Sequence, residues 1–343
     1  MKLKLAASML EKQTGLTHEN QYFNEYGEKI EIGSSLCLIN TTGIILKVTK
    51  KLSEPLQYKS KELVGKSIGQ LMKNNCDFND ILKKVTDQDY CSMVIYIAGK
   101  NSNLYTFSVI FVGIYNALGN LHSLICLGQD VSESIRLNAE IIETQKELIY
   151  ILGEIIENHS QETSLHIKRV ALISELLARK YGLGNQHSEM IKVASSVHDI
   201  GKISIPAEIL NKPGKLTEAE FQIIKKHPEI GFNLLSSSDK PLIKMAANIA
   251  YEHHEHFDGK GYPRGLSGYH IAIEARIVGL SDVFDALSNQ RIYKAPWIRQ
   301  DIEKYLQTNS GLQFDPDLVT IFLANIDEIF TIRSKLRDKF SPV

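Results

Sequence analysis

The pattern of hydrophobic and polar residues divides the chain into three zones, and the first reaches to about residue 130. Short runs rich in Ile, Val, Leu and Tyr are separated by turn residues such as those at 116–119, which predicts β-strands joined by turns. Strands are expected within 35–48, 90–97, 104–115 and 121–128, with a shorter helical stretch at about 60–84. This zone is therefore predicted to be a small α+β domain with an antiparallel sheet.

The second zone, at about residues 131–156, has the repeat of a heptad-like helix. It contains no proline and a single glycine, and an isoleucine recurs every seven residues, at Ile135, Ile142, Ile149 and Ile156. The alternate seam positions hold Asn138, Gln145 and Leu152, so the seam is imperfect. Two interpretations remain open. The segment is either an amphipathic helix packed on its own domain or a parallel dimeric linker that carries a signal from the first zone to the third.

The third zone, from about residue 158 onward, is predicted to be a succession of helices. The helical pattern covers 165–181, 188–197, 218–226, 241–253, 272–287 and 300–307, and loops with Gly and Pro separate these segments. Thr217 and Glu220 form a capping box that is expected to begin one of the helices. The chain is thus predicted to be multidomain, with a helical extension at 1–32, the α+β domain at 33–130, a helical linker at 131–157 and an all-α domain at 158–343.

Length and charge agree with this division and limit the expected partners. A chain of 343 residues is long enough for two or three domains. The formal net charge of −1 gives no global basic field, so neither a nucleic acid polymer nor a membrane surface is an expected partner. Glu11 and Lys12 interrupt the N-terminal apolar stretch, and the longest apolar run, 107–115, is too short to span a membrane. We therefore expect a soluble, cytoplasmic protein.

The candidate chemistry lies in a crowd of histidines, because nine of the eleven fall between His159 and His270. Glu162 and His166 are four residues apart on a predicted helix and therefore share one face. Candidate ligands are also adjacent in the sequence at 198–199, a histidine and an aspartate, and at 253–254, two histidines. Imidazole and carboxylate ligands favour iron, manganese, zinc or nickel, and the four cysteines form no CxxC pair. Ions bridged by a carboxylate share a hydroxide nucleophile, which predicts phosphodiester hydrolysis without a protein nucleophile.

Four runs of sequence carry a resemblance to a known family. They are VHDIGKISIP (Val197–Pro206), HPEIG (His227–Gly231), HHEHFDGKGYPRGL (His253–Leu266) and SDVFDALSNQRIYK (Ser281–Lys294). In this order and spacing they resemble the HD-GYP family of cyclic dinucleotide phosphodiesterases, over about residues 155–310. The resemblance implies a mostly helical domain with two or three divalent metal ions, most often iron, with manganese, nickel or zinc as alternatives. It also implies hydrolysis of cyclic di-GMP to pGpG, to GMP or to both, and some members prefer cyclic GMP-AMP.

The resemblance assigns a set of metal ligands. These would be Glu162, His166, His198, Asp199, His227, His253, His254 and Asp282, with Asp199 as the bridging carboxylate. Members with only two ions tend to lack the early glutamate, so Glu162 favours a third ion. Four other histidines are expected not to be ligands, namely His159, His187, His256 and His270.

Further matched positions imply roles in catalysis and substrate binding. Besides Asp199, the expected catalytic residues are Lys202, which would stabilise charge on the scissile phosphate, and Asp285, which would accept a proton or hold a metal-bound water. The expected substrate-binding residues are Lys202, Tyr262, Arg291 and Lys294, since Arg offers phosphate a bidentate fork and Lys a point charge. Ile292 replaces a proline that many members have, and we expect this to affect only the stiffness of the loop.

The first zone resembles a PAS domain. The signs are a strand, an Asn-x-x-Gly turn and a second strand within 36–72, then Leu-Val-Gly-Lys before a helix, and the run LICLGQDVSE (Leu124–Glu133). Cys76 lacks the rest of a flavin-adduct motif, and only His18 and His122 could serve haem in this region. The ligand of this domain therefore stays unknown, either a small metabolite or none. The expected assembly is a homodimer through the PAS-like domain and the linker helix.

Three functions remain to be distinguished. The leading one is metal-dependent hydrolysis of cyclic di-GMP, regulated by the PAS-like domain. The second is a catalytically silent module that binds a cyclic dinucleotide, although such a module has no need of eight metal ligands. The third is a hydrolase with another substrate, either cyclic GMP-AMP or, for a different HD-type phosphohydrolase, a nucleotide. The Gly-Tyr-Pro loop and the pair Arg291 and Lys294 argue against that last possibility.

Overall fold

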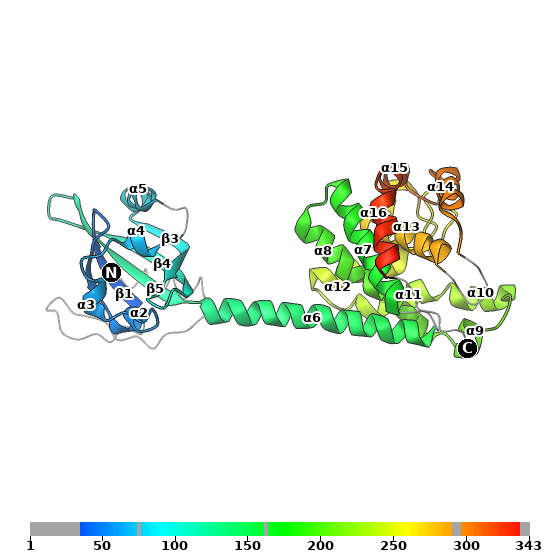
Figure 1. Ribbon diagram of the computed structural model, residues 1–343, viewed down its shortest axis with the longest axis horizontal. Coiled ribbons are helices and arrows are strands. Elements are labelled where there is room, and N and C mark those ends of the chain that lie inside the picture. The colour runs from blue at the N-terminus through cyan, green and yellow to red at the C-terminus, as the bar shows by residue number, and fades with distance from the viewer. Residues whose placement is uncertain (1–34, 74–76, 161–163, 290–295, 337–343) are drawn as a thin grey trace. The chain divides into compact units, whose positions relative to one another are not determined.

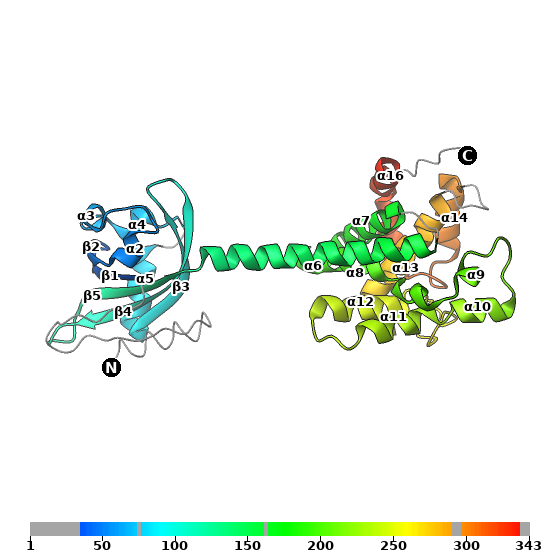
Figure 2. The ribbon, with the colours of Figure 1, turned by 90° about the horizontal axis from the view of Figure 1, so that it is seen from below.

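The computed structural model describes residues 35–73, 77–160, 164–289 and 296–336. The chain divides into two compact units between Ile141 and Ile142, and each unit has its own hydrophobic core. Figures 1 and 2 show a sheet-containing first unit and a helical second unit, so the predicted fold class is confirmed. The predicted extension at 1–32 lies outside the described residues. Among the helices that the structure describes, none has both the length and the apolarity that a membrane span requires.

The first unit is built on an antiparallel sheet of five strands in the order β2-β1-β5-β4-β3. The strands are β1 (Ser35–Asn40), β2 (Ile45–Val48), β3 (Tyr90–Ala98), β4 (Leu104–Tyr115) and β5 (Leu121–Asp130). A tight turn joins β1 to β2, because the Asn40 side chain accepts hydrogen bonds from the backbone N–H groups of Thr42 and Ile44. Gly43 completes this turn at φ +83°, a conformation that favours glycine.

Short helices cover the sheet of the first unit. They are α2 (Lys50–Ser53), α3 (Ser60–Leu63), α4 (Ile68–Leu71) and α5 (Phe78–Gln88). The single helical stretch expected at 60–84 is therefore broken, since the chain turns at Gly65 with φ +87°. The side chain of Asp77 accepts a hydrogen bond from the backbone N–H of Asn79 and so caps α5.

The second unit consists of helices and their connecting loops. The longer helices are α7 (Ser164–Tyr181), α8 (Asn185–Ala194), α11 (His227–Leu235), α12 (Pro241–Glu252), α13 (Ile273–Ser288), α14 (Arg299–Thr308), α15 (Pro316–Ala324) and α16 (Ile326–Lys335). Shorter ones are η1 (Ser195–Val197), η2 (Ile200–Ser204), α9 (Ala207–Leu210), α10 (Glu218–Ile224) and η3 (Gly268–His270). The capping box predicted at Thr217 and Glu220 begins α10.

Helix α7 lies at the centre of this unit and brings distant parts of the chain together. It packs against α8, α13, α15 and α16, and its side chains Val170, Ile173 and Leu177 are fully buried in the core. Phe284 of α13 is buried in the same core. The packing of α7 on α13 therefore places the beginning of one helix beside the end of the other, although more than a hundred residues separate them in sequence.

Helix α6 (Ser132–His159) begins directly after β5 and uses its C-terminal half to pack on the helical unit. Ile149 and Ile156 are buried there, and a Cβ on Gly153 would collide with the carbonyl oxygen of Ser196. Of the two interpretations left open for this helix, packing on its own domain therefore describes the C-terminal half, because these two isoleucines face the helical unit. The earlier isoleucines of the repeat, Ile135 and Ile142, are 50% and 53% exposed.

Candidate metal centre

The predicted ligands reach one region of the second unit from five separate places in the chain. His166 lies in the first turn of α7, and Asp282 lies on α13. His198 and Asp199 lie between η1 and η2, and His227 is the first residue of α11. The pair 253–254 follows directly after α12. Each histidine or carboxylate outside α13 thus sits at or near a helix end, where the side chain can turn inward.

A close approach of two backbones explains the glycine that follows the His-Asp pair. A Cβ on Gly201 would collide with the carbonyl oxygen of His227 and would come 2.7 Å from the backbone nitrogen of Gly231. Only a residue without a side chain allows η2 to lie this close to α11. The Asp-Ile-Gly sequence therefore brings Asp199 and His227 together.

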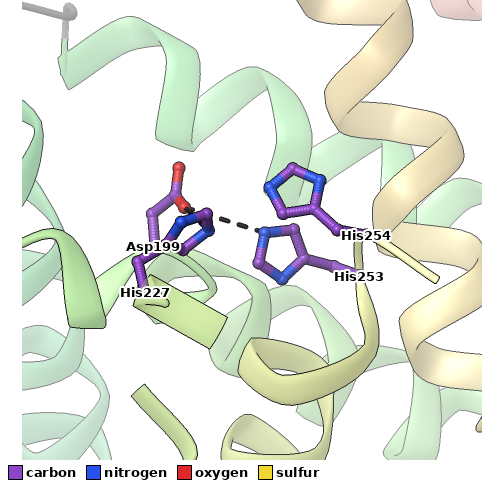
Figure 3. Close-up of side chains that lie close together, drawn as sticks. All are labelled: Asp199, His227, His253 and His254. Atoms are coloured by element: carbon purple, nitrogen blue, oxygen red, sulfur yellow. Dashed lines mark ion pairs between the residues drawn. The ribbon is translucent and has the colours of Figure 1, made fainter. Parts of the chain in front are cut away.

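The ligand atoms form two groups that meet at Asp199. In the first group, one ligand atom from each of Asp199, His227, His253 and His254 lies within 4.8 Å of the others, and Figure 3 shows the three imidazoles gathered at the aspartate. The second group joins His166, His198 and Asp282 in the same way.

The two oxygens of Asp199 face different groups. Its Oδ1 lies 3.0 Å from His227 Nε2, whereas its Oδ2 lies 3.3 Å from His198 Nε2. This is the arrangement that a carboxylate needs to bridge two ions.

The hydrogen bonds of the histidines fix which ring nitrogen faces inward. His198 Nδ1 donates to the carbonyl oxygen of Ser195 at 2.8 Å, and His227 Nδ1 donates to that of Ile224 at 2.7 Å. His253 Nδ1 donates to the carbonyl oxygen of Ile249 at 3.0 Å. Because a carbonyl only accepts, each Nδ1 carries a proton, which leaves Nε2 as the nitrogen that a metal ion can reach. These three Nε2 atoms are buried and form no hydrogen bond with the described residues, so the donor set fits divalent metal ions.

The charges of the site follow from burial and from its carboxylates. Burial opposes ionisation of Asp199, but the ammonium of Lys202 at 2.6 Å and His198 hold the pKa of Asp199 well below its usual value. Burial lowers the pKa of His198, but Asp199 and Asp282 outweigh it and raise that pKa to about 9. Burial and the neighbouring imidazoles lower the pKa of His254 well below its usual value. Asp199 is therefore an anion and His254 a neutral imidazole, the forms that bind metal.

Asp285 lies behind His166, on the side away from the ligand groups. Its carboxylate accepts hydrogen bonds from His166 Nδ1 at 2.8 Å, from Arg169 Nε at 2.6 Å and from Asn289 Nδ2 at 2.9 Å. Asp285 is only 2% exposed. This position differs from the one expected for an acceptor of a substrate proton, and it favours a role in orienting His166.

Arg169 was not among the residues expected from the sequence. It is 2% exposed, pairs with both oxygens of Asp285 and donates from Nη1 to the carbonyl oxygen of Leu336 at 2.9 Å. Its place one helical turn after His166 was the only available signal, because its partner Asp285 is 116 residues away.

Two buried glutamates hold the loop that carries Gly-Tyr-Pro beside the groups of ligand atoms. Glu255 accepts hydrogen bonds from the backbone N–H groups of Arg264 and Leu266, and Glu252 accepts from the Arg264 side chain and from the backbone N–H of Ala272. Both glutamates are also residues that the sequence reasoning missed. Their roles follow from backbone contacts 9 to 20 residues away, which no motif displays.

Tyr262 of this loop lies between the groups of ligand atoms and Lys225, the residue that follows α10. Its ring stacks on His254, with centroids 4.7 Å apart and an interplanar angle of 26°. Burial, then Asp199 and Asp282, raise the pKa of the Tyr262 hydroxyl. The ammonium of Lys225 lies 5.3 Å from the centre of the Tyr262 ring and 4.8 Å from that of Phe221, which are cation–π distances.

The remaining predicted residues separate into two sets. Glu162, Arg291 and Lys294 lie outside the described residues. The four histidines expected not to be ligands, His159, His187, His256 and His270, belong to neither group of ligand atoms within the described ranges. His187 instead pairs with Glu274 at 2.9 Å.

Two family matches cover most of the chain. Residues 150–318 match the HD domain and residues 33–133 match the PAS domain. A 3'3'-cGAMP-specific phosphodiesterase 2 of Vibrio cholerae is 40% identical over 265 residues, which is 76% of this chain and 50% of the relative. A cyclic di-GMP phosphodiesterase response regulator of Xanthomonas campestris is 43% identical over 184 residues, 54% of this chain and 49% of the relative.

A cyclic di-GMP phosphodiesterase of Thermotoga maritima is 39% identical over 193 residues, 56% of this chain and 52% of the relative. The chain thus spans about half the length of these curated relatives. The predicted resemblances are confirmed: the chain contains an HD domain with a PAS domain before it in sequence, and its relatives are cyclic di-GMP and 3'3'-cGAMP phosphodiesterases of the HD-GYP family.

Proposed function

We propose that this chain hydrolyses cyclic di-GMP with the aid of divalent metal ions. The observation that carries the proposal is the meeting of two imidazole and carboxylate groups at the two oxygens of Asp199. Paired sites of this kind serve in-line displacement at phosphorus. The named activities of the relatives support the same reaction.

The residues fit two ions directly. His227, His253 and His254 would hold one, His166, His198 and Asp282 the other, and Asp199 would bridge them. Divalent ions supply Lewis acidity and lower the pKa of water. A third ion depends on Glu162, and iron is our first choice of metal, with manganese, nickel and zinc as alternatives.

Lys202 and Tyr262 would act on the substrate itself. The ammonium of Lys202 pairs with Asp199 Oδ2 at 2.6 Å and is nearly buried, so it can donate to an oxygen of the scissile phosphate as negative charge grows there. Tyr262 offers a ring beside His254 and a hydroxyl. We keep Arg291 and Lys294 as phosphate ligands on the strength of the resemblance, and we assign Asp285 to the orientation of His166.

A second substrate has a specific observation in its favour. The relative that aligns over 76% of this chain is named as specific for 3'3'-cGAMP, whereas relatives named as cyclic di-GMP phosphodiesterases align over 49% to 64% of it. Cyclic GMP-AMP is therefore the second candidate. Both substrates present two phosphates and two purines, so metal ions held by the two groups of ligand atoms could act on either one.

Regulation is proposed to pass from the PAS domain through α6 within a homodimer. Helix α6 follows β5 without a break and packs its C-terminal half on the helical unit. Several large apolar side chains of α6 are about half exposed, which supports a partner helix at this surface. A ligand of the PAS domain stays unknown.

The proposal is tested by purifying the chain without oxygen, measuring its metal content and assaying both cyclic dinucleotides. We expect about two or three metal ions per chain and release of pGpG or GMP from at least one substrate. A metal-replete protein that binds a cyclic dinucleotide but hydrolyses neither would instead be the silent binding module. A protein that acts only on simple nucleotides would be a different phosphohydrolase.

A further inference from the structure

Helix α6 carries an apolar stripe that differs from the predicted seam. Leu137, Ile141, Leu148, Ile151 and Ile155, with Thr144 among them, follow one another at alternating steps of four and three residues. The five apolar side chains are between 43% and 55% exposed. Steps of four and three are the spacing of the two core positions of a coiled coil. The stripe therefore has the pattern of a seam, and its five apolar side chains are left about half exposed.

The opposite side of the same helix is already occupied. In the heptad set by this stripe, Gly153 takes the position directly across the helix from the seam, and it packs closely on Ser196. Lys146 takes the equivalent position one heptad earlier and pairs with Glu189 at 2.5 Å. Because the docked face and the stripe lie on opposite sides, the stripe faces away from the helical unit that holds α6.

We propose that this stripe pairs with the same stripe of a second copy, as a parallel two-stranded coiled coil over residues 137–155. The inference rests on the homodimer of the proposed function and specifies its interface. It replaces the predicted seam of Ile135, Ile142, Ile149 and Ile156 by one that is rotated around the helix. A second copy is the partner because an identical stripe supplies matching steps of four and three along the whole length.

The charges beside the stripe determine the orientation of the two helices. Glu140, Glu147 and Glu154 flank it on one side, and Asn138, Gln145 and Leu152 flank it on the other. In an antiparallel pair, the glutamates of one helix would face those of the other and repel them. In a parallel pair, each glutamate meets the uncharged flank of its partner. The parallel arrangement also brings the two PAS domains to the same end of the coil.

Cysteine cross-linking distinguishes the proposed seam from its neighbour. Ile141 belongs to the stripe and Ile142 does not, yet both side chains are 53% exposed, so Ile141→Cys and Ile142→Cys are a matched pair. Both are made in a Cys76→Ser background, in which the native cysteines Cys37, Cys91 and Cys126 are buried. After mild oxidation of the full chain, we expect at least about tenfold more disulfide-linked dimer from Ile141→Cys.

Other outcomes overturn the proposal in different ways. More disulfide-linked dimer from Ile142→Cys than from Ile141→Cys would show that the helices pair through the predicted isoleucine repeat. Ile141→Cys and Ile151→Cys chains can also be mixed and oxidised together. More mixed disulfide-linked dimer than dimer of either variant with itself would show an antiparallel pair. A wild-type chain that light scattering finds monomeric at micromolar concentration would remove the homodimer as well. None of these readouts depends on hydrolysis, so failure here is distinct from failure of the proposed reaction.

A charge within the stripe gives a second measurement that does not need disulfide formation. Leu148→Asp places a carboxylate in the proposed seam, whereas Glu143→Asp changes a surface position of the same helix. We expect light scattering to show monomers for Leu148→Asp and dimers for Glu143→Asp. A dimer that persists unchanged in Leu148→Asp contradicts the proposed interface.

Discussion

The two units of this protein bury different kinds of side chain. Within the described part of the first unit, the buried polar residues are the serines Ser53, Ser108 and Ser123, and the rest of the interior is apolar. The second unit buries an arginine, several histidines and several acidic residues. Burying charge is costly unless partners or metal ions compensate for it. The difference places the buried charged side chains, and with them the candidate chemistry, in the helical unit.

The thiols of the first unit fit this division. Burial raises the pKa of the Cys37 thiol to about 12, and burial also raises the pKa of Cys126, its neighbour across β1 and β5. A protonated, buried thiol is a poor nucleophile and a poor metal ligand. These cysteines therefore behave as small apolar side chains.

Removal of metal is expected to have the largest effect and to separate the two units. Chelation should abolish hydrolysis and lower the stability of the helical unit by about 4 kcal/mol relative to protein with metal at roughly a thousand times its dissociation constant. The unfolding transition of the PAS unit should not move. Calorimetry with and without chelator measures both transitions. Equal shifts in the two units would contradict the comparison.

Arg169→Met is expected to have the next largest effect. The substitution leaves Asp285 buried beside His166 without its cationic partner, which should lower the free energy of unfolding of the helical unit by about 3–5 kcal/mol. Metal content should fall as well, because His166 loses its fixed orientation. Urea denaturation and elemental analysis measure the two effects.

Arg179→Met is the control for this prediction. Arg179 lies on the same helix and pairs with Glu175 at 2.7 Å, but its side chain is 52% exposed. Its loss should cost less than about 0.5 kcal/mol. Similar effects of the two substitutions would mean that the buried network does not support the metal centre.

Lys225→Met should weaken substrate binding more than it slows the reaction. The ammonium lies beside the rings of Tyr262 and Phe221 and forms no ion pair with any residue that the structure describes, so a substrate phosphate is a suitable partner. We expect KM to rise about fivefold, the effect of one partly exposed charge contact. Lys226→Met, at the exposed neighbouring position, should leave KM as it is. A fall in kcat with constant KM would contradict this assignment.

A further expected effect is a dependence of metal binding on pH. The pKa of His198 is raised to about 9 by Asp199 and Asp282, against the lowering by burial. Below that pH a metal ion must displace the proton, so metal affinity should rise with pH by up to about tenfold per unit between pH 7 and pH 9. Titration of the chelated protein with metal at several pH values measures this slope. A constant affinity over this range would contradict the charge assignment.

The sequence predicted the residues that form the groups of ligand atoms better than the residues that hold those groups and the nearby loop in place. The structure gathers His166, His198, Asp199, His227, His253, His254 and Asp282, and each of these lies in a short motif or at a helical spacing that the sequence displays. Arg169, Glu252 and Glu255 act through partners that only the folded chain brings near. An arginine or a glutamate whose partner lies elsewhere in the sequence is not marked by any local motif.

Helix α6 shows the same limit in a different form. The isoleucine repeat correctly indicated a helix, but apolar residues repeat on more than one side of it. Ile149 is buried against its own unit, whereas Leu148 beside it is 55% exposed. Hydrophobic periodicity identifies apolar faces, and it does not say which face packs within the domain and which is left for a partner.

The central claim is that Asp199 joins two metal positions, and Asp199→Ala tests it directly. Metal content per chain and hydrolysis of cyclic di-GMP and cyclic GMP-AMP should be measured on wild type and variant purified side by side without oxygen, with folding checked by circular dichroism. We predict that the folded variant loses most of its metal and all measurable hydrolysis. A folded Asp199→Ala chain that keeps both its metal and its activity would contradict the account.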